Sequence, residues 1–249
     1  MRKLVGVIDS GVGGLTILKQ LQVAYPQCDY IYIADGAYCP YGTKQPHEIF
    51  RRVYLLVYYL KWRGVTSVII ACNTASTYVE RLRRMFPFPI HDVIAPTCHL
   101  IADVTECRRV ALLATDATVD SGIYQRTLLS YGIDTVAYKC SSFVPFVEAN
   151  AVNTPQCEQT VRHVLQQLPL ANIDTVILGC THFPLLRKQI TQCTGNAKVV
   201  ECTTDFTIQH ALRFASKGHT LYLTTGCPNN TNAASRWFSD VNFKYVNIP

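Results

Sequence analysis

Short, continuously apolar runs alternate with helix-like segments along almost the whole chain, and this alternation limits the fold more than any other feature. Residues 67–70 and 175–178, for example, are rich in Val and Ile, and each run is followed by a helix-like segment. Strands that are apolar on both faces must be covered on both faces, and helices between successive parallel strands provide that cover. The sequence therefore predicts an α/β fold built from parallel sheets.

The expected elements cover most of the 249 residues. Strands are expected over residues 3–8, 30–34, 67–70, 90–94, 109–114, 134–139, 175–178, 198–201, 220–225 and 243–246. Helices are expected over residues 15–25, 46–62, 77–85, 120–131, 154–168, 205–215 and 232–238, with one more starting at residue 184. Open parallel sheets place ligands beyond the carboxyl ends of their strands. The residues expected at these ends are Asp9, Tyr41, Cys72, Thr115 and Cys180.

Two similar α/β domains are expected, although no low-complexity linker separates them. The proline-containing stretch near residues 87–96 and the loop near residues 202–206 are the best candidates for boundaries. We expect a discontinuous first domain of residues 1–94 plus 207–249 and a second domain of residues 95–206. The active site would lie in the cleft between the two domains.

Two cysteine motifs stand at equivalent places in these halves, 108 residues apart (180 minus 72). Cys72 lies in the run Ala-Cys-Asn-Thr-Ala-Ser, and Cys180 lies in the run Gly-Cys-Thr-His-Phe-Pro. Each follows an expected strand and precedes a helix-like segment, a placement that lowers the pKa of a thiol and makes it a usable acid or base. One such cysteine would fit an ordinary core, whereas the repeated pattern indicates function.

The composition and the charge pattern argue against several classes of protein. The net charge is +6, from 23 basic and 17 acidic residues, and only Arg81, Arg83 and Arg84 are clustered. A nucleic-acid-binding protein usually has a denser basic stripe, so no nucleic-acid partner is expected. No two of the 11 cysteines form C-x-x-C, which argues against a zinc ribbon or a thioredoxin-type pair, and no bound metal is expected.

The apolar runs give no sign of export or of a membrane partner. The first run ends at Asp9, too soon for a secretory signal, and the longest, residues 53–60, is too short to span a bilayer. We therefore expect a cytoplasmic protein with reduced cysteines.

The glycines that follow the first strand do not form a nucleotide-binding motif. The segment reads Asp-Ser-Gly-Val-Gly-Gly from Asp9, and Thr16 stands where G-x-G-x-x-G requires its third glycine. A loop of this kind still offers free backbone N–H groups that could hold a carboxylate.

Two thiols that face one another across a substrate suit the inversion of a stereocentre. One group removes a proton from one face of the carbon, and the other supplies a proton to the opposite face. The pKa of a free thiol, about 8.5, lies closer to working pH than that of a carboxylate, about 4. Asp9 and His182 are the candidates that would set the protonation states of the two thiols.

Taken together, these motifs resemble those of the cofactor-independent glutamate racemases of the aspartate/glutamate racemase superfamily. The resemblance is carried by residues 9–14, 40–42, 71–76 and 179–182, which span most of the chain in the family's order. It implies an isomerase that interconverts L-glutamate and D-glutamate without a cofactor. It further implies a role in peptidoglycan synthesis, cell wall biogenesis and cell shape, and a homodimer.

The same resemblance implies roles for individual residues. Cys72 and Cys180 would be the acid/base residues, with Cys72 serving D-glutamate and Cys180 serving L-glutamate, and Asp9 and His182 would assist them. Hydroxyl and amide groups would bind the two carboxylates of the substrate, and Asp9 or Glu148 could face its ammonium group. The implied substrate-binding residues are Asp9, Ser10, Tyr41, Gly42, Asn73, Thr74, Thr115, Thr118, Glu148, Thr181 and His182.

Two stretches depart from the family's pattern. The chain reads Gly-Ala-Tyr-Cys over residues 36–39, where the family commonly has a Thr-Ala-Arg run, and it lacks the glycine that often follows Pro96. Both departures concern loop detail, regulation or dimer contacts rather than the residues of the site.

Two other functions compete with glutamate racemisation. An aspartate or hydantoin racemase of the same superfamily is the first, although residues 9–11 and 40–42 argue against it. The second is a non-catalytic metal- or amino-acid-binding protein with Cys72, Cys180 and His182 as ligands, a spacing that fits no usual zinc pattern.

Overall fold

The computed structural model describes residues 3–168, 170–203 and 217–249, whose strands form two sheets. Sheet A contains β1 (Leu4–Asp9), β2 (Asp29–Ala34), β3 (Ser67–Ile70), β4 (Ile90–His91), β9 (Thr220–Thr224) and β10 (Lys244–Tyr245), in the order β10-β9-β2-β1-β3-β4. Sheet B contains β5 (Arg109–Ala114), β6 (Asp134–Lys139), β7 (Thr175–Gly179) and β8 (Lys198–Glu201), in the order β6-β5-β7-β8. The pairings within both sheets are parallel, which confirms the predicted fold class.

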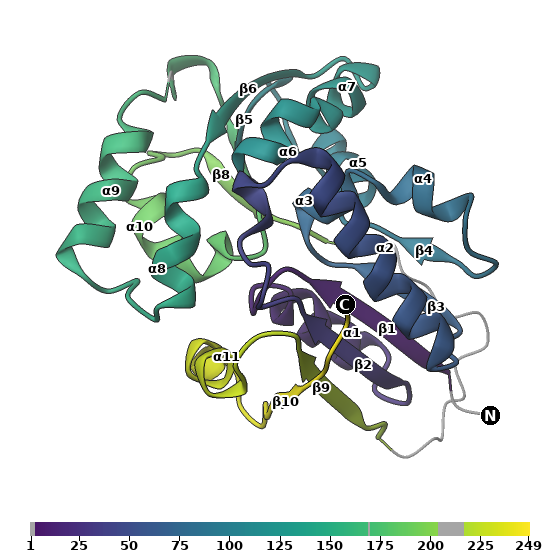
Figure 1. Ribbon diagram of the computed structural model, residues 1–249. Coiled ribbons are helices and arrows are strands. Elements are labelled where there is room, and N and C mark those ends of the chain that lie inside the picture. The colour runs from purple at the N-terminus through teal and green to yellow at the C-terminus, as the bar shows by residue number, and fades with distance from the viewer. Residues whose placement is uncertain (1–2, 169, 204–216) are drawn as a thin grey trace.

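Helices connect the strands and cover both sheets (Figure 1). They are α1 (Leu15–Ala24), α2 (Pro46–Trp62), α3 (Asn73–Ser76), α4 (Val79–Arg83), α5 (Ile94–Val104), α6 (Asp116–Ser121), α7 (Ile123–Ser130), α8 (Val144–Glu148), α9 (Pro155–Leu165), α10 (Arg187–Thr191) and α11 (Pro228–Ala234). Within the described residues, no helix combines the length and the apolar character that crossing a membrane requires.

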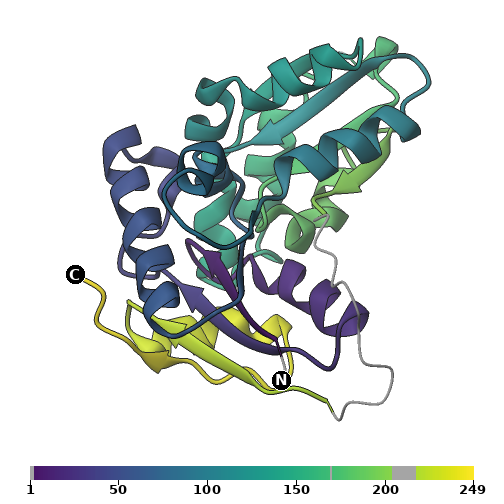
Figure 2. The same ribbon diagram turned by 90° about the vertical axis from the view of Figure 1, so that its right-hand side faces the viewer.

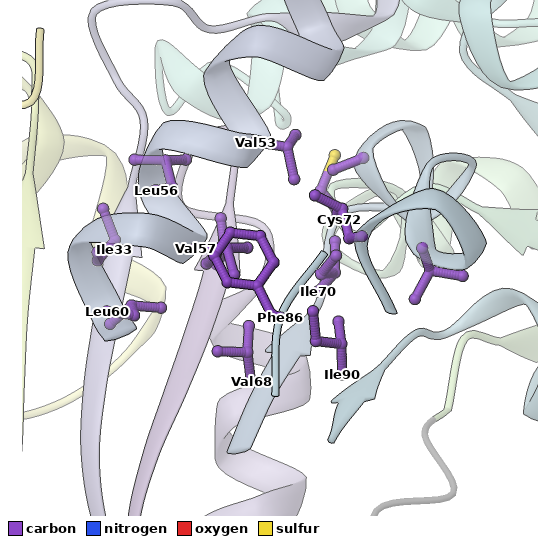
Figure 3. Packing of buried hydrophobic residues seen from close by; sticks show 14 of the residues in the cluster. Ile33, Val53, Leu56, Val57, Leu60, Val68, Ile70, Cys72, Phe86 and Ile90 are labelled. Carbon is purple, nitrogen blue, oxygen red and sulfur yellow. The ribbon is translucent and has the colours of Figure 1, made fainter. Parts of the chain in front are cut away.

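Sheet A lies between α1 and α2. Successive side chains of a strand point to opposite faces of the sheet, so a central strand such as β1 packs against both helices. Val5 and Val7 of β1 pack with α1, whereas Ile8 packs with α2. Figure 3 shows the second of these layers, in which Val53 and Val57 of α2 lie over β3. Apolar burial of this kind supplies the main stabilisation of such a layered domain.

Sheet B is covered in the same way. Alternate residues of β5 divide between two clusters, one with α8, α9 and α10 and the other with α5 and α7. Figures 1 and 2 show sheet B and its helices as a second unit next to sheet A. Sheet A takes its strands from both ends of the chain, and sheet B takes its strands from the middle. The domain boundaries stay a prediction, and the second of them, between residues 206 and 207, lies outside the described residues.

Several expected elements have different bounds in the structure. The expected helix 77–85 is the shorter α4, and a separate short helix, α3, precedes it from Asn73. Gly122, with φ +63°, divides the expected helix 120–131 into α6 and α7. The last expected helix starts earlier, at Pro228, because proline fits the first turn of a helix. The expected helix 205–215 lies outside the described residues.

One helix was not expected. The expected strand 90–94 is only two residues long, and α5 starts at Ile94. Asp92 makes this early start possible, because its Oδ1 accepts hydrogen bonds from the N–H groups of Ile94 (2.8 Å) and Ala95 (2.9 Å). An aspartate in this place satisfies backbone donors that would otherwise have no partner.

A buried ion pair fixes the loop that follows β2. The Asp35 carboxylate accepts hydrogen bonds from Arg52 Nη2 at 2.9 Å and Arg52 Nε at 3.1 Å. It also accepts one from the hydroxyl of Tyr41 and one from that of Thr225, the latter at 2.7 Å. Arg52 Nη1 donates to the carbonyl of Ile248 at 3.0 Å. The pair therefore ties α2, the Tyr41 loop and the last residues of the chain together.

We predict that Arg52→Met lowers the free energy of unfolding by about 3–5 kcal/mol, because Asp35 would stay buried without its positive partner. Urea unfolding followed by circular dichroism measures the change. Lys139→Met is the matched control: it breaks an ion pair with Asp120 whose side chains are both about half exposed, and it should cost far less than Arg52→Met, because solvent screens exposed ion pairs. Equal losses in the two variants would contradict the prediction.

Candidate functional site

The loops that follow β1 and β7 meet between the two sheets. Asp9 ends β1 and is fully buried; its Oδ2 accepts a hydrogen bond from the N–H of Gly11 at 3.0 Å. Its Oδ1 accepts a hydrogen bond from the Thr181 hydroxyl, which belongs to the loop after β7, at 3.1 Å. Burial raises the pKa of Asp9 to about 6, although the charge of His182 and these hydrogen bonds favour the carboxylate. A single carboxyl group therefore links the two units.

The glycine-rich loop after β1 has no side chains at the positions where the second unit comes closest. A Cβ atom on Gly13 would lie 2.6 Å from Thr181 Oγ1 and 2.7 Å from His182 Nδ1. A Cβ atom on Gly11 would lie 2.1 Å from Glu148 Oε1. Glycine is required here for close approach rather than for a phosphate. The loop does hold carboxylates through its N–H groups, but they are the protein's own, those of Asp9 and Glu148.

Cys72 follows β3 and lines a small cavity between the sheets. Its Sγ lies 3.7 Å from Ser10 Oγ, and Figure 3 shows it beside the apolar layer that contains Val53 and Ile70. Burial raises the pKa of Cys72 to about 12, and the negative charge of Asp9 adds to this effect. The expectation of a lowered thiol pKa is therefore wrong for Cys72, because desolvation outweighs the one backbone N–H bond that favours the thiolate.

Cys180 follows β7 and has an ionised neighbour. Its Sγ lies 3.8 Å from His182 Nδ1, and His182 Nε2 lies 2.6 Å from Glu148 Oε1. Burial alone would lower the pKa of His182, but the bonds to Cys180 and Glu148 hold it well above its usual value. Burial alone would raise the pKa of Glu148, but the hydrogen bond from His182 and its charge hold this pKa below its usual value. An imidazolium–carboxylate pair therefore stands beside the Cys180 thiol.

Hydroxyl groups from both units meet at the same cavity. The Oγ1 atoms of Thr74, Thr115 and Thr118 form a triangle with sides of 2.8, 3.1 and 2.9 Å. Because Thr74 belongs to α3 and the other two lie after β5, this cluster is a second contact between the units. A hydroxyl can donate or accept, so the triangle can turn its donors toward an anion.

The cavity itself is small, about 10 Å³, which is room for about one water molecule. Its lining residues are Ser10, Pro40, Tyr41, Gly42, Cys72, Asn73, Thr74, Thr115, Val144, Cys180, Thr181 and His182. Of the expected substrate-binding residues, Asp9, Thr118 and Glu148 are not in this lining. Each is hydrogen-bonded to a residue that is, so their contact with a substrate stays a prediction.

The sequence patterns did not identify the side chains that hold cavity residues in place. The hydroxyl of Tyr124 donates to Asn73 Oδ1 at 2.6 Å, and Asn73 Nδ2 donates to Cys202 Sγ at 3.2 Å. Cys202 directly follows β8, as Cys180 directly follows β7. This position after a strand was the one signal in the sequence that could have identified Cys202. Arg52 and Tyr124 lie within helices and carried no signal in the sequence.

The geometry also bears on the metal-binding alternative. Within the described ranges, the potential metal ligands that converge as a group of three are Cys39, Glu148 and His182. Of the three ligands considered in that alternative, His182 belongs to this group, whereas Cys72 and Cys180 do not.

Comparison with known proteins identifies close relatives of the chain. The family model described as Asp/Glu/Hydantoin racemase matches residues 15–211. The glutamate racemase of Aquifex aeolicus is 37% identical over 198 residues, which cover 79% of this chain and 78% of that protein. The crystal structure of a glutamate racemase isoform from Bacillus anthracis has a TM-score of 0.89 at 26% identity, covering 99% of this chain and 98% of that one. The glutamate racemase of Francisella tularensis, solved in complex with D-glutamate, has a TM-score of 0.85 at 26% identity, with 99% and 98% covered.

The raised pKa of Asp9 predicts a pH-dependent stability. The folded protein keeps the Asp9 proton up to about pH 6, whereas the unfolded chain loses it near pH 3.8. Between these values the folded state binds more protons, so the stability from this group falls as the pH rises. About two pKa units correspond to about 3 kcal/mol.

Asp9→Asn removes this titration. The free energy of unfolding of the variant relative to wild type should therefore increase by about 3 kcal/mol between about pH 4 and pH 7. Urea unfolding at several pH values measures the difference. Parallel pH profiles for the two proteins would show that the Asp9 carboxyl is not desolvated.

Proposed function

We propose that this chain, which belongs to the Asp/Glu/Hydantoin racemase family, interconverts L-glutamate and D-glutamate with Cys72 and Cys180 as its two acid/base residues. One observation carries the proposal: two thiols from different sheets line one buried cavity. Each thiol has a charged group near it, Asp9 for Cys72 and the His182–Glu148 pair for Cys180.

The two thiols have different charged neighbours. Burial and Asp9 keep the proton on Cys72, whereas the imidazolium of His182 lies beside Cys180. With L-glutamate bound, the Cys180 thiolate removes the Cα proton, and the Cys72 thiol gives its proton to the opposite face. The product is D-glutamate, and the proton positions are then those that the reverse reaction needs. This direction agrees with the assignment that the family resemblance implies.

Polar groups of the cavity would hold the substrate. Ser10, Asn73 and Thr74 on the sheet A side and Thr115 and Thr181 on the sheet B side can donate hydrogen bonds to two carboxylates. Donors directed at the α-carboxylate would also stabilise the negative charge that develops when Cα loses its proton. We propose that this stabilisation takes the place of a cofactor.

The substrate is proposed to be glutamate rather than aspartate or a hydantoin. The three relatives described above match most of the chain and are glutamate racemases, and one of them was solved with D-glutamate. D-glutamate made in this way would serve peptidoglycan synthesis, and we propose that it is made in the cytoplasm. Parallel assays with L-glutamate, L-aspartate and a hydantoin distinguish the three substrates.

Deuterium exchange tests the two-thiol mechanism. Wild type in deuterated water should place deuterium at Cα of the product from either enantiomer. Cys72→Ala should lose racemisation but still exchange the Cα proton of L-glutamate, since Cys180 would remove a proton and return a deuteron to the same face. Cys180→Ala should show the same behaviour with D-glutamate only. Proton NMR follows the exchange, and circular dichroism follows the racemisation.

Cys157→Ala is the matched control, because Cys157 is fully buried in α9 and does not line the cavity. It should racemise glutamate at close to the wild-type rate. Near-normal racemisation by Cys72→Ala or Cys180→Ala would overturn the mechanism. Exchange of the opposite enantiomer by each variant would reverse the assignment of the two cysteines.

We also propose that the chain forms a homodimer, with the outer face of α2 as its contact. Tyr58 is 54% exposed and Trp62 is 78% exposed on this helix, and exposed aromatic side chains are enriched in protein interfaces. Sedimentation should give twice the chain mass of 27.9 kDa. Trp62→Glu should shift the equilibrium to monomer, whereas Trp237→Glu, outside α2, should not. A monomeric wild type would refute the proposal.

A further inference from the structure

Three potential metal ligands converge beside the catalytic cavity. The Sγ atom of Cys39, a carboxylate oxygen of Glu148 and a ring nitrogen of His182 all lie within 4.8 Å of one another. Cys39 lies in the loop after β2, Glu148 ends α8, and His182 lies in the loop after β7. The first residue belongs to the unit of sheet A and the other two belong to the unit of sheet B.

The ligand set suits one class of cation. A thiolate, an imidazole and a carboxylate are the groups that bind Zn²⁺, at distances of about 2.0–2.3 Å. Ligand atoms around a tetrahedral Zn²⁺ are therefore about 3.5 Å apart. His182 Nε2 and Glu148 Oε1 already lie 2.6 Å apart, so they need to separate by about 1 Å. Three protein ligands would leave the fourth position for a water molecule.

The surroundings support these ligands. The N–H of Val12 donates to Glu148 Oε1 at 3.2 Å, and His182 Nδ1 faces Cys180, which leaves Nε2 for a metal. Partners of this kind orient the ligands of a metal site. Gly11 places no side chain between the ligands, since a Cβ atom there would lie 2.1 Å from Glu148 Oε1 and 3.1 Å from Cys39 Sγ.

An entry path is also present. Cys39 and Glu148 line a second cavity of about 640 Å³, which Asn150 and Arg236 also line. His182 lines the small cavity of the active site instead. A cation that enters the larger cavity therefore reaches Cys39 and Glu148 first, and His182 behind them.

We propose that Cys39, Glu148 and His182 form a site for Zn²⁺ or a similar thiophilic divalent cation, and that the bound cation inhibits the racemase. Binding replaces the hydrogen bond between His182 and Glu148, and the protons of that bond and of the Cys39 thiol pass to solvent. The cation joins Cys39 of one unit to Glu148 and His182 of the other, and so holds the small cavity between the units closed to the substrate. The inhibition rests on the active site proposed above, whereas the binding does not.

Cobalt and zinc test the two parts separately on the full chain. Co²⁺ added to the metal-free protein should bind with a stoichiometry of one and give a thiolate-to-cobalt charge-transfer band, and Zn²⁺ should displace it. Zn²⁺ should also inhibit racemisation, and a chelator should restore the activity. Loss of a supporting partner alone usually weakens a metal site 10–100-fold. Cys39→Ser should therefore remove the charge-transfer band and raise the Zn²⁺ concentration for half-inhibition by about 100-fold.

Matched variants control for misfolding and for metal binding by other cysteines. Cys39→Ala should behave like Cys39→Ser, and both should keep racemase activity without metal. Cys107→Ser, which changes an exposed cysteine outside either cavity, should bind and respond to Zn²⁺ as wild type does. An unchanged cobalt spectrum in Cys39→Ser would overturn the site. Stoichiometric binding without inhibition would overturn the inhibitory role and leave the site in place. If the two-cysteine mechanism fails the exchange test, the cobalt spectrum still decides on the site.

Discussion

The hydrogen bond between the buried carboxyl of Asp9 and the hydroxyl of Thr181 is the contact on which the arrangement of this molecule depends. It joins the carboxyl end of β1 in sheet A to the loop after β7 in sheet B, with no solvent at the carboxyl group. The same approach leaves no space for a side chain at Gly13. Cys72 follows a strand of sheet A, and Cys180 follows a strand of sheet B. Their thiols can line one cavity because the Asp9–Thr181 bond holds the two sheets together at this edge. Burying a carboxyl group costs free energy unless it is hydrogen-bonded, so the hydrogen bonds from Gly11 and Thr181 permit this geometry.

Local sequence patterns predicted much of the fold. Residues 46–62 and 109–114 coincide with α2 and β5, because apolar spacing reports directly on burial. The start of α5 escaped prediction because it depends on the Asp92 side chain, and the break at Gly122 requires a positive φ that the spacing does not reveal. The domain boundaries stay a prediction.

The site was predictable where a residue directly follows a strand, as Cys72 and Cys180 do. Parallel strands gather such residues at one edge, so their position along the chain implies their place in space. Arg52 and Tyr124 reach the site from helices by way of Asp35 and Asn73, and contacts of this kind depend on packing between elements. The charge states were the hardest to predict. A helix N-terminus suggested an acidic thiol at Cys72, but burial has the larger effect and raises its pKa.

The small cavity has a kinetic consequence. A space for about one water molecule cannot admit a hydrated amino acid, so the conformation that performs the chemistry is not the one that meets the substrate. Any opening between the two units acts on the Asp9–Thr181 bond and on the threonine cluster, because both join the units. Collective motions of whole domains take microseconds to milliseconds, which is the time scale for an opening of this kind. Such gating makes the rate of substrate entry sensitive to the viscosity of the solvent, even though proton transfer between a buried thiol and Cα is not.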